Sequence, residues 1–83
     1  MKYKDTVVFF VSDWCNPCKE TKKYLRDNYL NGNYVLLDVT KNERYSHSMK
    51  VVNIPVAIKF DSEGNEVKRY VGYNPERIDN ILM

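Results

Sequence analysis

Four short segments of the chain are rich in β-branched and aromatic residues, a composition that favours strands. The first, residues 6–11 (TVVFFV), is apolar without a break, which is typical of a strand buried on both faces of a sheet. Residues 34–39 (YVLLDV) form the second segment. Residues 56–60 and 67–71 flank the Gly-containing turn at residues 61–65, so they predict an antiparallel hairpin. The pattern therefore predicts four strands, with the first strand in the middle of the sheet.

A polar segment with helical periodicity follows the first predicted strand. Pro17 lacks a backbone N–H, which costs nothing in the first turn of a helix, and Asn31-Gly32 provides a stop signal. A helix is therefore predicted over about residues 17–30. The inward positions of this helix are expected to include Cys18, Thr21, Tyr24, Leu25 and Tyr29. The charged outer face is expected to comprise Lys19, Glu20, Lys22, Lys23, Arg26 and Asp27.

Two shorter segments complete the predicted elements. Residues 42–50 predict a short helix or an irregular loop, with Tyr45 and Met49 as inward contacts. Asn74-Pro75 is an N-cap followed by a proline, and the apolar repeat after it predicts a last helix through Ile78, Ile81 and Leu82. The order of elements is β-α-β-α-β-β-α. Because a helix separates the first two strands, they should lie parallel in an α/β fold with a four-stranded mixed sheet flanked by helices.

Composition and charge exclude several function classes. With 83 residues the chain has room for a single domain, which we assign to residues 1–83. Hydrophobic residues make up 43% and charged residues 29%, as in ordinary globular proteins, and the net charge of +2 is interspersed, so nucleic-acid binding is not indicated. The apolar run at residues 6–11 is too short for a signal-peptide core or a membrane span. We therefore expect a cytoplasmic monomer that binds no membrane.

Both cysteines of the chain lie in the motif Trp14-Cys15-Asn16-Pro17-Cys18, between the first predicted strand and the first predicted helix. A C-x-x-C motif in a βαβ context is typical of a redox dithiol. Cys15 lies where unpaired helix N–H groups and the positive end of the helix dipole favour a thiolate, so we predict that it is the nucleophile. Cys18, one turn further along, is predicted to face the protein and to act as the resolving thiol.

Structural and metal-binding roles fit this spacing less well. A disulfide between Cys15 and Cys18 closes a loop of four residues, for which chain entropy gives only about 2 kcal/mol of stabilisation. A zinc site needs four ligands, and the chain has one histidine, His47, which lies in a polar stretch and receives no predicted role. We therefore predict no metal, and no cofactor other than the Cys15–Cys18 disulfide itself.

From residue 6 to the C-terminus the chain resembles the thioredoxin family. The resemblance rests on the cysteine motif, on the segment VNIP at residues 52–55 ahead of a strand, on the hairpin loop at residues 61–65, and on the dipeptide at residues 71–72 ahead of the last helix. It implies a three-layer thioredoxin-like fold for nearly the whole chain.

The same resemblance implies a substrate groove beside the dithiol. Pro55 would be a cis proline that faces the cysteines, and the Ile54 backbone would pair with an extended segment of the substrate. Gly72 and Trp14 would flank this groove. The expected substrate-binding residues are Trp14, Asn16, Pro17, Ile54, Gly72 and Tyr73.

The chain departs from the thioredoxin pattern in three ways. It is shorter by about one N-terminal strand and helix, which would leave residues 34–39 as an edge strand. Asn16 stands where thioredoxins usually carry Gly, and this position helps to set the reduction potential. Phe9 stands six positions before the first cysteine, where the family has a buried acid. Proton transfer from the resolving thiol must therefore use another group or water, and Asp38 is a candidate.

Residues and resemblance together predict a thiol–disulfide oxidoreductase that reduces protein disulfides. Cys15 attacks a substrate sulfur to form a mixed disulfide, and Cys18 then attacks Cys15 and releases the reduced substrate. The expected partners are disulfide-containing proteins and an electron donor, either a thioredoxin-reductase-like protein or a small thiol.

Two alternative functions are open. Glutaredoxins are similarly compact and use glutathione, but they usually carry C-P-Y-C and a Gly-Gly-x-x-Asp element after the last strand, where this chain has VGYNP at residues 71–75. The second alternative is a redox-independent binding module that grips a partner through the surface around Trp14, Ile54, Gly72 and Tyr73.

Overall fold

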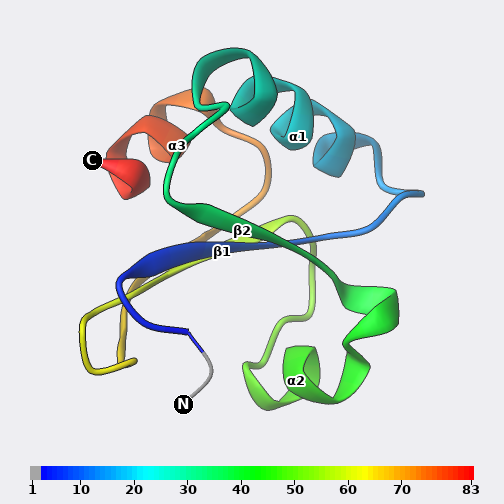
Figure 1. Ribbon diagram of the computed structural model, residues 1–83. Helices are drawn as coiled ribbons and strands as arrows, with labels where there is room; N and C mark the ends of the chain where they lie inside the picture. The colour runs from blue at the N-terminus through cyan, green and yellow to red at the C-terminus, as the bar shows by residue number, and fades with distance from the viewer. Residues whose placement is uncertain (1–2) are drawn as a thin grey trace.

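The computed structural model describes residues 3–83, in which a mixed sheet lies between helices on its two faces (Figure 1). The strands are β1 (Thr6–Val11), β2 (Tyr34–Asp38), β3 (Val56–Phe60) and β4 (Glu66–Val71), in the spatial order β2-β1-β3-β4. β1 pairs parallel with β2 and antiparallel with β3, and β3 pairs antiparallel with β4. The predicted four-stranded mixed sheet is confirmed, with β1 inside and β2 at an edge.

The apolar run of β1 divides its side chains between the two faces of the sheet. Helices α1 (Asn16–Asn28) and α3 (Pro75–Leu82) cover one face, and α2 (Glu43–Ser48) covers the other (Figure 1). Val7, Phe9 and Val11 are buried under α1 and α3, in a cluster with Leu25, Ile78 and Ile81. Val8 and Phe10 are buried on the α2 side, with Leu37, Val56, Ile58 and Phe60. β1 thus has the two buried faces that its sequence predicts.

Several predicted element ends are shifted by one or two residues. α1 ends at Asn28 rather than near residue 30, because Tyr29 leaves the helical conformation with φ −139 and ψ 41. β2 ends at Asp38, because Val39 begins a 3₁₀ turn, η1 (Val39–Lys41). The Asp38 side chain caps this turn by accepting a hydrogen bond from the Thr40 N–H. β4 begins at Glu66, one residue earlier than predicted.

The weakly patterned segment after β2 forms the short helix α2. Tyr45 and Met49, its predicted inward contacts, are half-buried and pack against the core cluster on that face. The Tyr45 ring stacks on Phe10 of β1 with ring centroids 6.0 Å apart. Aromatic packing on the central strand therefore fixes α2, whose own sequence has little apolar periodicity.

A shared carboxylate ties α1 to α3 at the end away from the cysteines. The hydroxyls of Tyr24 and Tyr29 both donate to Asp79 Oδ1, at 2.9 and 2.5 Å. Hydrogen bonding to this carboxylate raises the pKa of Tyr29 from its ordinary value of 10.0 to about 12, and that of Tyr24 shifts in the same direction. Because these pKa values are raised in the folded state, the contribution of the cluster is present below pH 10 and is lost as the pH rises through about 12.

Replacing Asp79 with Ala should release both tyrosine hydroxyls. We expect the pKa of Tyr29 to fall from about 12 towards 10.0, and the urea midpoint of unfolding to fall, because two charge-assisted hydrogen bonds are lost. Tyrosinate absorbance against pH and urea denaturation measure the two effects. Asp27→Ala is the matched control, since Asp27 pairs with the exposed side chains of Lys23 and Arg26 on α1. An unchanged tyrosine titration in Asp79→Ala would contradict this account.

Candidate active site

Cys15 lies at the start of α1 and caps it. Its backbone is extended, with φ −99 and ψ 117, and its Sγ accepts a hydrogen bond from the backbone N–H of Cys18 at 3.3 Å. Pro17 occupies the first turn, where the missing N–H leaves no gap in the helix. The sequence Cys-Asn-Pro-Cys therefore builds an N-cap whose acceptor is a sulfur atom. The helix N-terminus favours negative charge on this sulfur.

The two thiols differ in exposure and in ionisation. Cys15 retains 8% of its surface and Cys18 none, and both are free thiols in this structure. Burial, and after it the side-chain hydrogen bond with Cys15, raises the pKa of Cys18 from 9.0 to about 12. The Ser12 backbone and the charge of Lys22 act in the opposite direction. Cys18 is therefore protonated at neutral pH.

The loop before β3 faces Cys15. The Ile54–Pro55 peptide bond is cis, as the resemblance implied. Cys15 Sγ lies 3.7 Å from the carbonyl oxygen of Ile54, to which the thiol donates. Gly72, with φ +96, donates its N–H to the Pro55 carbonyl at 2.8 Å, so a residue in the left-handed region holds the other side of this loop. Three segments far apart in the sequence thus meet at the cysteine motif.

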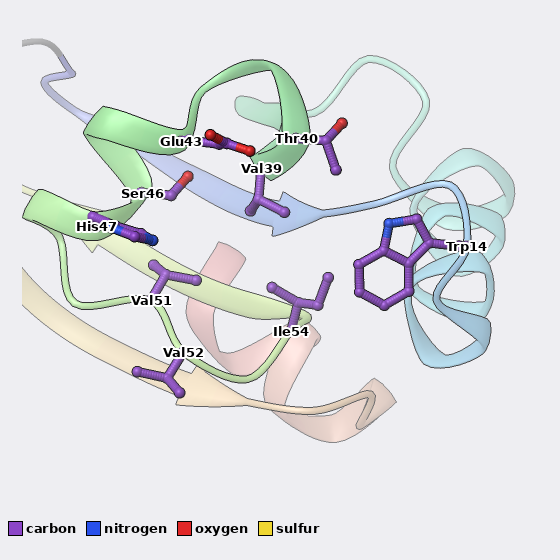
Figure 2. Close-up of a pocket in the computed structure, with 9 residues that line it drawn as sticks. All are labelled: Trp14, Val39, Thr40, Glu43, Ser46, His47, Val51, Val52 and Ile54. Atoms are coloured by element: carbon purple, nitrogen blue, oxygen red, sulfur yellow. The ribbon is translucent and has the colours of Figure 1, made fainter.

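A hollow of about 290 Å³ opens next to the motif (Figure 2). Trp14 and Ile54 lie together at one end of it, and His47 and Val51 lie towards the other end (Figure 2). Its walls are mainly apolar, and two of its residues are unusually exposed for their type, Trp14 at 71% and Val52 at 84%. The full lining is Trp14, Val39, Thr40, Glu43, Ser46, His47, Val51, Val52 and Ile54. An exposed apolar surface of this kind is typical of a binding site.

The hollow includes only two of the predicted substrate-binding residues, Trp14 and Ile54. Asn16 and Pro17 begin α1 beside Cys15. Tyr73 packs against the core cluster on the α1 and α3 side, with its ring centroid 6.5 Å from that of Tyr24. The sequence analysis did not predict that His47 and the valines Val39, Val51 and Val52 line a hollow. The available signal was the pair of adjacent valines, Val51 and Val52, shortly before Pro55.

Lys22 departs from its predicted place on the outer face of α1. Its side chain is 29% exposed, against 65% for Lys23, and its Nζ lies 3.2 Å from Asp13 Oδ1 in the segment before Cys15. The Lys22 charge acts on Asp38, at the end of β2, and on Cys18, so Lys22 belongs to the surroundings of the site.

The structure argues against Asp38 as the base for Cys18. Its carboxylate accepts hydrogen bonds from the backbone N–H and the hydroxyl of Thr40, at 2.8 and 2.6 Å. These bonds lower the pKa of Asp38, which makes it a weaker proton acceptor. Phe9 is buried under the helices, and its ring meets that of Tyr34 edge to face, with centroids 5.8 Å apart. Because its side chain is a hydrocarbon, Phe9 cannot accept the proton of Cys18.

Residues 3–83 contain neither a cluster of metal ligands nor a membrane-spanning helix. No three or more His, Cys, Asp or Glu side chains in this range are grouped so that they could hold a metal ion. Within the same range, no helix has both the length and the apolar character that a membrane crossing requires.

Comparison with known sequences places these features in one family. The sequence model of the thioredoxin-like domain matches residues 2–82. The SPbeta prophage-derived thioredoxin-like protein YosR of Bacillus subtilis is 35% identical over 68 residues, which are 82% of this chain and 82% of that protein. Mitochondrial thioredoxin-2 of Schizosaccharomyces pombe is 28% identical over 82 residues, covering 95% of this chain and 61% of that protein.

Solved structures show the same fold. Oxidised mitochondrial thioredoxin 3 of Saccharomyces cerevisiae superposes with a TM-score of 0.80 at 24% identity, covering 98% of this chain and 79% of that chain. Reduced thioredoxin of Schistosoma mansoni gives a TM-score of 0.77 at 28% identity, covering 93% and 74%. The thioredoxin-like fold expected from the sequence is thereby confirmed.

Alkylation should distinguish the two thiols. The pKa of Cys18 is raised from 9.0 to about 12, so this thiol keeps its proton at neutral pH and loses it only as the pH rises through that range. Iodoacetamide near neutral pH should therefore modify Cys15 well before Cys18, as measured by mass spectrometry of the peptides. Cys15→Ser is the control and should react slowly until the pH is strongly alkaline. Preferential labelling of Cys18 in the wild type would reverse the assignment.

Proposed function

The chain belongs to the thioredoxin family, and from that membership and the site geometry we propose that it is a thiol–disulfide oxidoreductase that reduces protein disulfides. The observation that carries the proposal is the unequal pair of thiols. Cys15 Sγ caps α1 and Cys15 keeps 8% of its surface exposed, while Cys18 is fully buried and has a raised pKa. A nucleophile and a resolving thiol need this difference.

The reaction is a pair of thiol–disulfide exchanges. The Cys15 thiolate attacks one sulfur of the substrate disulfide, which forms a mixed disulfide and releases the first substrate thiolate. Cys18 then loses its proton and attacks the Cys15 sulfur, so that the Cys15–Cys18 bond forms and the second substrate thiolate leaves. Both released thiolates take up protons. Two electrons pass from the dithiol to the substrate, and an electron donor must reduce the Cys15–Cys18 disulfide again.

Protein segments fit the surface around Cys15 better than a small thiol does. The cis-proline loop presents Ile54 next to the nucleophile, and the hollow beyond it offers Trp14 and Val52 as exposed apolar contacts. A polypeptide that places its disulfide at Cys15 can lay an apolar side chain in this hollow. We propose disulfide-containing proteins as substrates, with a thioredoxin-reductase-like protein or a small thiol as electron donor, in the reducing environment of the cytoplasm.

A glutathione-linked activity has less support. The segment after β4 is VGYNP at residues 71–75, in which Gly72 holds the Pro55 carbonyl and Asn74 caps α3. The segment therefore lacks the second glycine and the acidic residue that a glutaredoxin is expected to carry at this position. A redox-independent binding module would use the same apolar surface, and the cysteine variants below separate it from the oxidoreductase.

The two cysteine variants should fail in different ways. Cys15→Ser should abolish reduction of insulin disulfides with dithiothreitol as electron source, because no thiolate remains at the helix N-terminus. Cys18→Ser should still attack and should accumulate covalent mixed disulfides, because only resolution is lost. Turbidity of insulin and non-reducing electrophoresis measure the two outcomes. If the wild type reduces no insulin but binds protein partners equally well in both redox states, the binding-module alternative holds.

Changing the hollow should affect protein substrates more than small ones. Val52→Asp places a charge on the apolar surface, and we expect the rate with a protein disulfide to fall about fivefold, the size of one lost apolar contact. The rate with a small disulfide such as dithiodipyridine should stay within about twofold. Val67→Asp is the matched control, because Val67 is also exposed, at 55%, but lies on β4 outside the hollow. Equal losses in both variants would contradict a substrate role for the hollow.

A further inference from the structure

Lys22 differs from the other cations of α1 in its surroundings. It lies four residues after Cys18, so the two side chains occupy adjacent turns on one side of the helix. Its side chain is 29% exposed, whereas those of Lys23 and Arg26 are 65% and 64% exposed. The Lys22 side chain is therefore largely covered by protein, and its ammonium group meets Asp13, two residues before Cys15, at 3.2 Å.

The charged and titratable groups around Lys22 come from three elements. Asp13 precedes Cys15 in the connection from β1, Asp38 ends β2, and Cys18 lies on α1 itself. The Lys22 charge lowers the pKa of Asp38 and also opposes the burial that raises the pKa of Cys18. Lys41 acts on Asp38 as well. The Lys22 charge thus acts on the buried Cys18 thiol and on Asp38, and Lys22 also forms an ion pair with Asp13.

Stability alone does not account for this placement. Asp13 is 85% exposed, and an ion pair with a partner so open to water contributes little to folding. Holding the long side chain of Lys22 against the protein also costs rotamer entropy. The positive charge of Lys22 favours the thiolate of Cys18, which must become negatively charged during the proposed reaction.

We propose that Lys22 is a positioning residue for resolution, whose ammonium group, anchored by Asp13, stabilises the negative charge that forms on the Cys18 sulfur. This inference rests on the proposed oxidoreductase function. In the step concerned, Cys18 gives its proton to solvent and its sulfur attacks the Cys15 sulfur of the mixed disulfide. The Cys15–Cys18 bond forms, the bond from Cys15 to the substrate breaks, and the departing substrate thiolate takes up a proton. Lys22 keeps its own proton throughout.

A single-turnover reaction separates attack from resolution. Reduced protein mixed with dithiodipyridine, an uncharged disulfide, releases one thiopyridone when Cys15 attacks and a second when Cys18 resolves. We expect Lys22→Gln to slow the second release about fivefold, the size of a partly exposed charge interaction, and to shift its pH dependence to higher pH. Lys22→Arg should restore the wild-type rate, and Lys22→Glu should be slower than Lys22→Gln. The first release should change much less in all three.

The matched control is Lys23→Gln, which removes an exposed cation from the neighbouring position of the same helix. It should leave both releases unchanged, and far-ultraviolet circular dichroism should show that every variant is folded. A second release that is unchanged in Lys22→Gln, or that falls equally in Lys22→Arg and Lys22→Gln, would overturn the role of Lys22. If wild type releases one thiopyridone and never a second, the proposed function itself fails, independently of Lys22.

Discussion

The hydrogen bond from the Cys18 N–H to the Cys15 sulfur is the interaction on which the rest of the site depends. It makes a thiol the N-cap of α1, and it thereby fixes the two cysteines one turn apart with different exposure. The helix can begin here because β1 delivers the chain to this point from the middle of the sheet and Pro17 needs no partner in the first turn. The central strand therefore determines where Cys15 lies.

In the proposed reaction, burial of Cys18 both protects this thiol and hinders its ionisation. A sealed thiol is protected from outside reagents and stays protonated, which keeps the reduced dithiol intact until Cys15 has reacted. The same burial opposes the thiolate that resolution requires. In this chain the groups that counter this effect are the Ser12 backbone and Lys22, while Phe9 on β1 adds only apolar surface beneath the helix. The Lys22 charge therefore acts on the Cys18 thiol in a chain that has Phe9 where the resemblance implied a buried acid.

The surface beside Cys15 combines a fixed backbone with an open apolar hollow. Gly72 holds the Pro55 carbonyl, so the Ile54 carbonyl is presented to Cys15 from a loop that is bound on both sides. Beyond Ile54, the hollow gathers residues of the motif, of η1, of α2 and of the loop at residues 51–54. The turn η1, which follows the edge strand β2, contributes Val39 and Thr40 to the lining of this hollow.

Local patterns in the sequence determined the strands, the caps and the chemistry of the motif. The unbroken apolar run of β1, the prolines at the starts of α1 and α3, and the C-x-x-C spacing act over a few residues, so each could be interpreted without knowing the rest of the chain. Only the tertiary structure decided which way Lys22 turns, where β2 ends, and which valines face Trp14. Those outcomes depend on contacts between elements that are distant in sequence, and no periodicity within one element contains them.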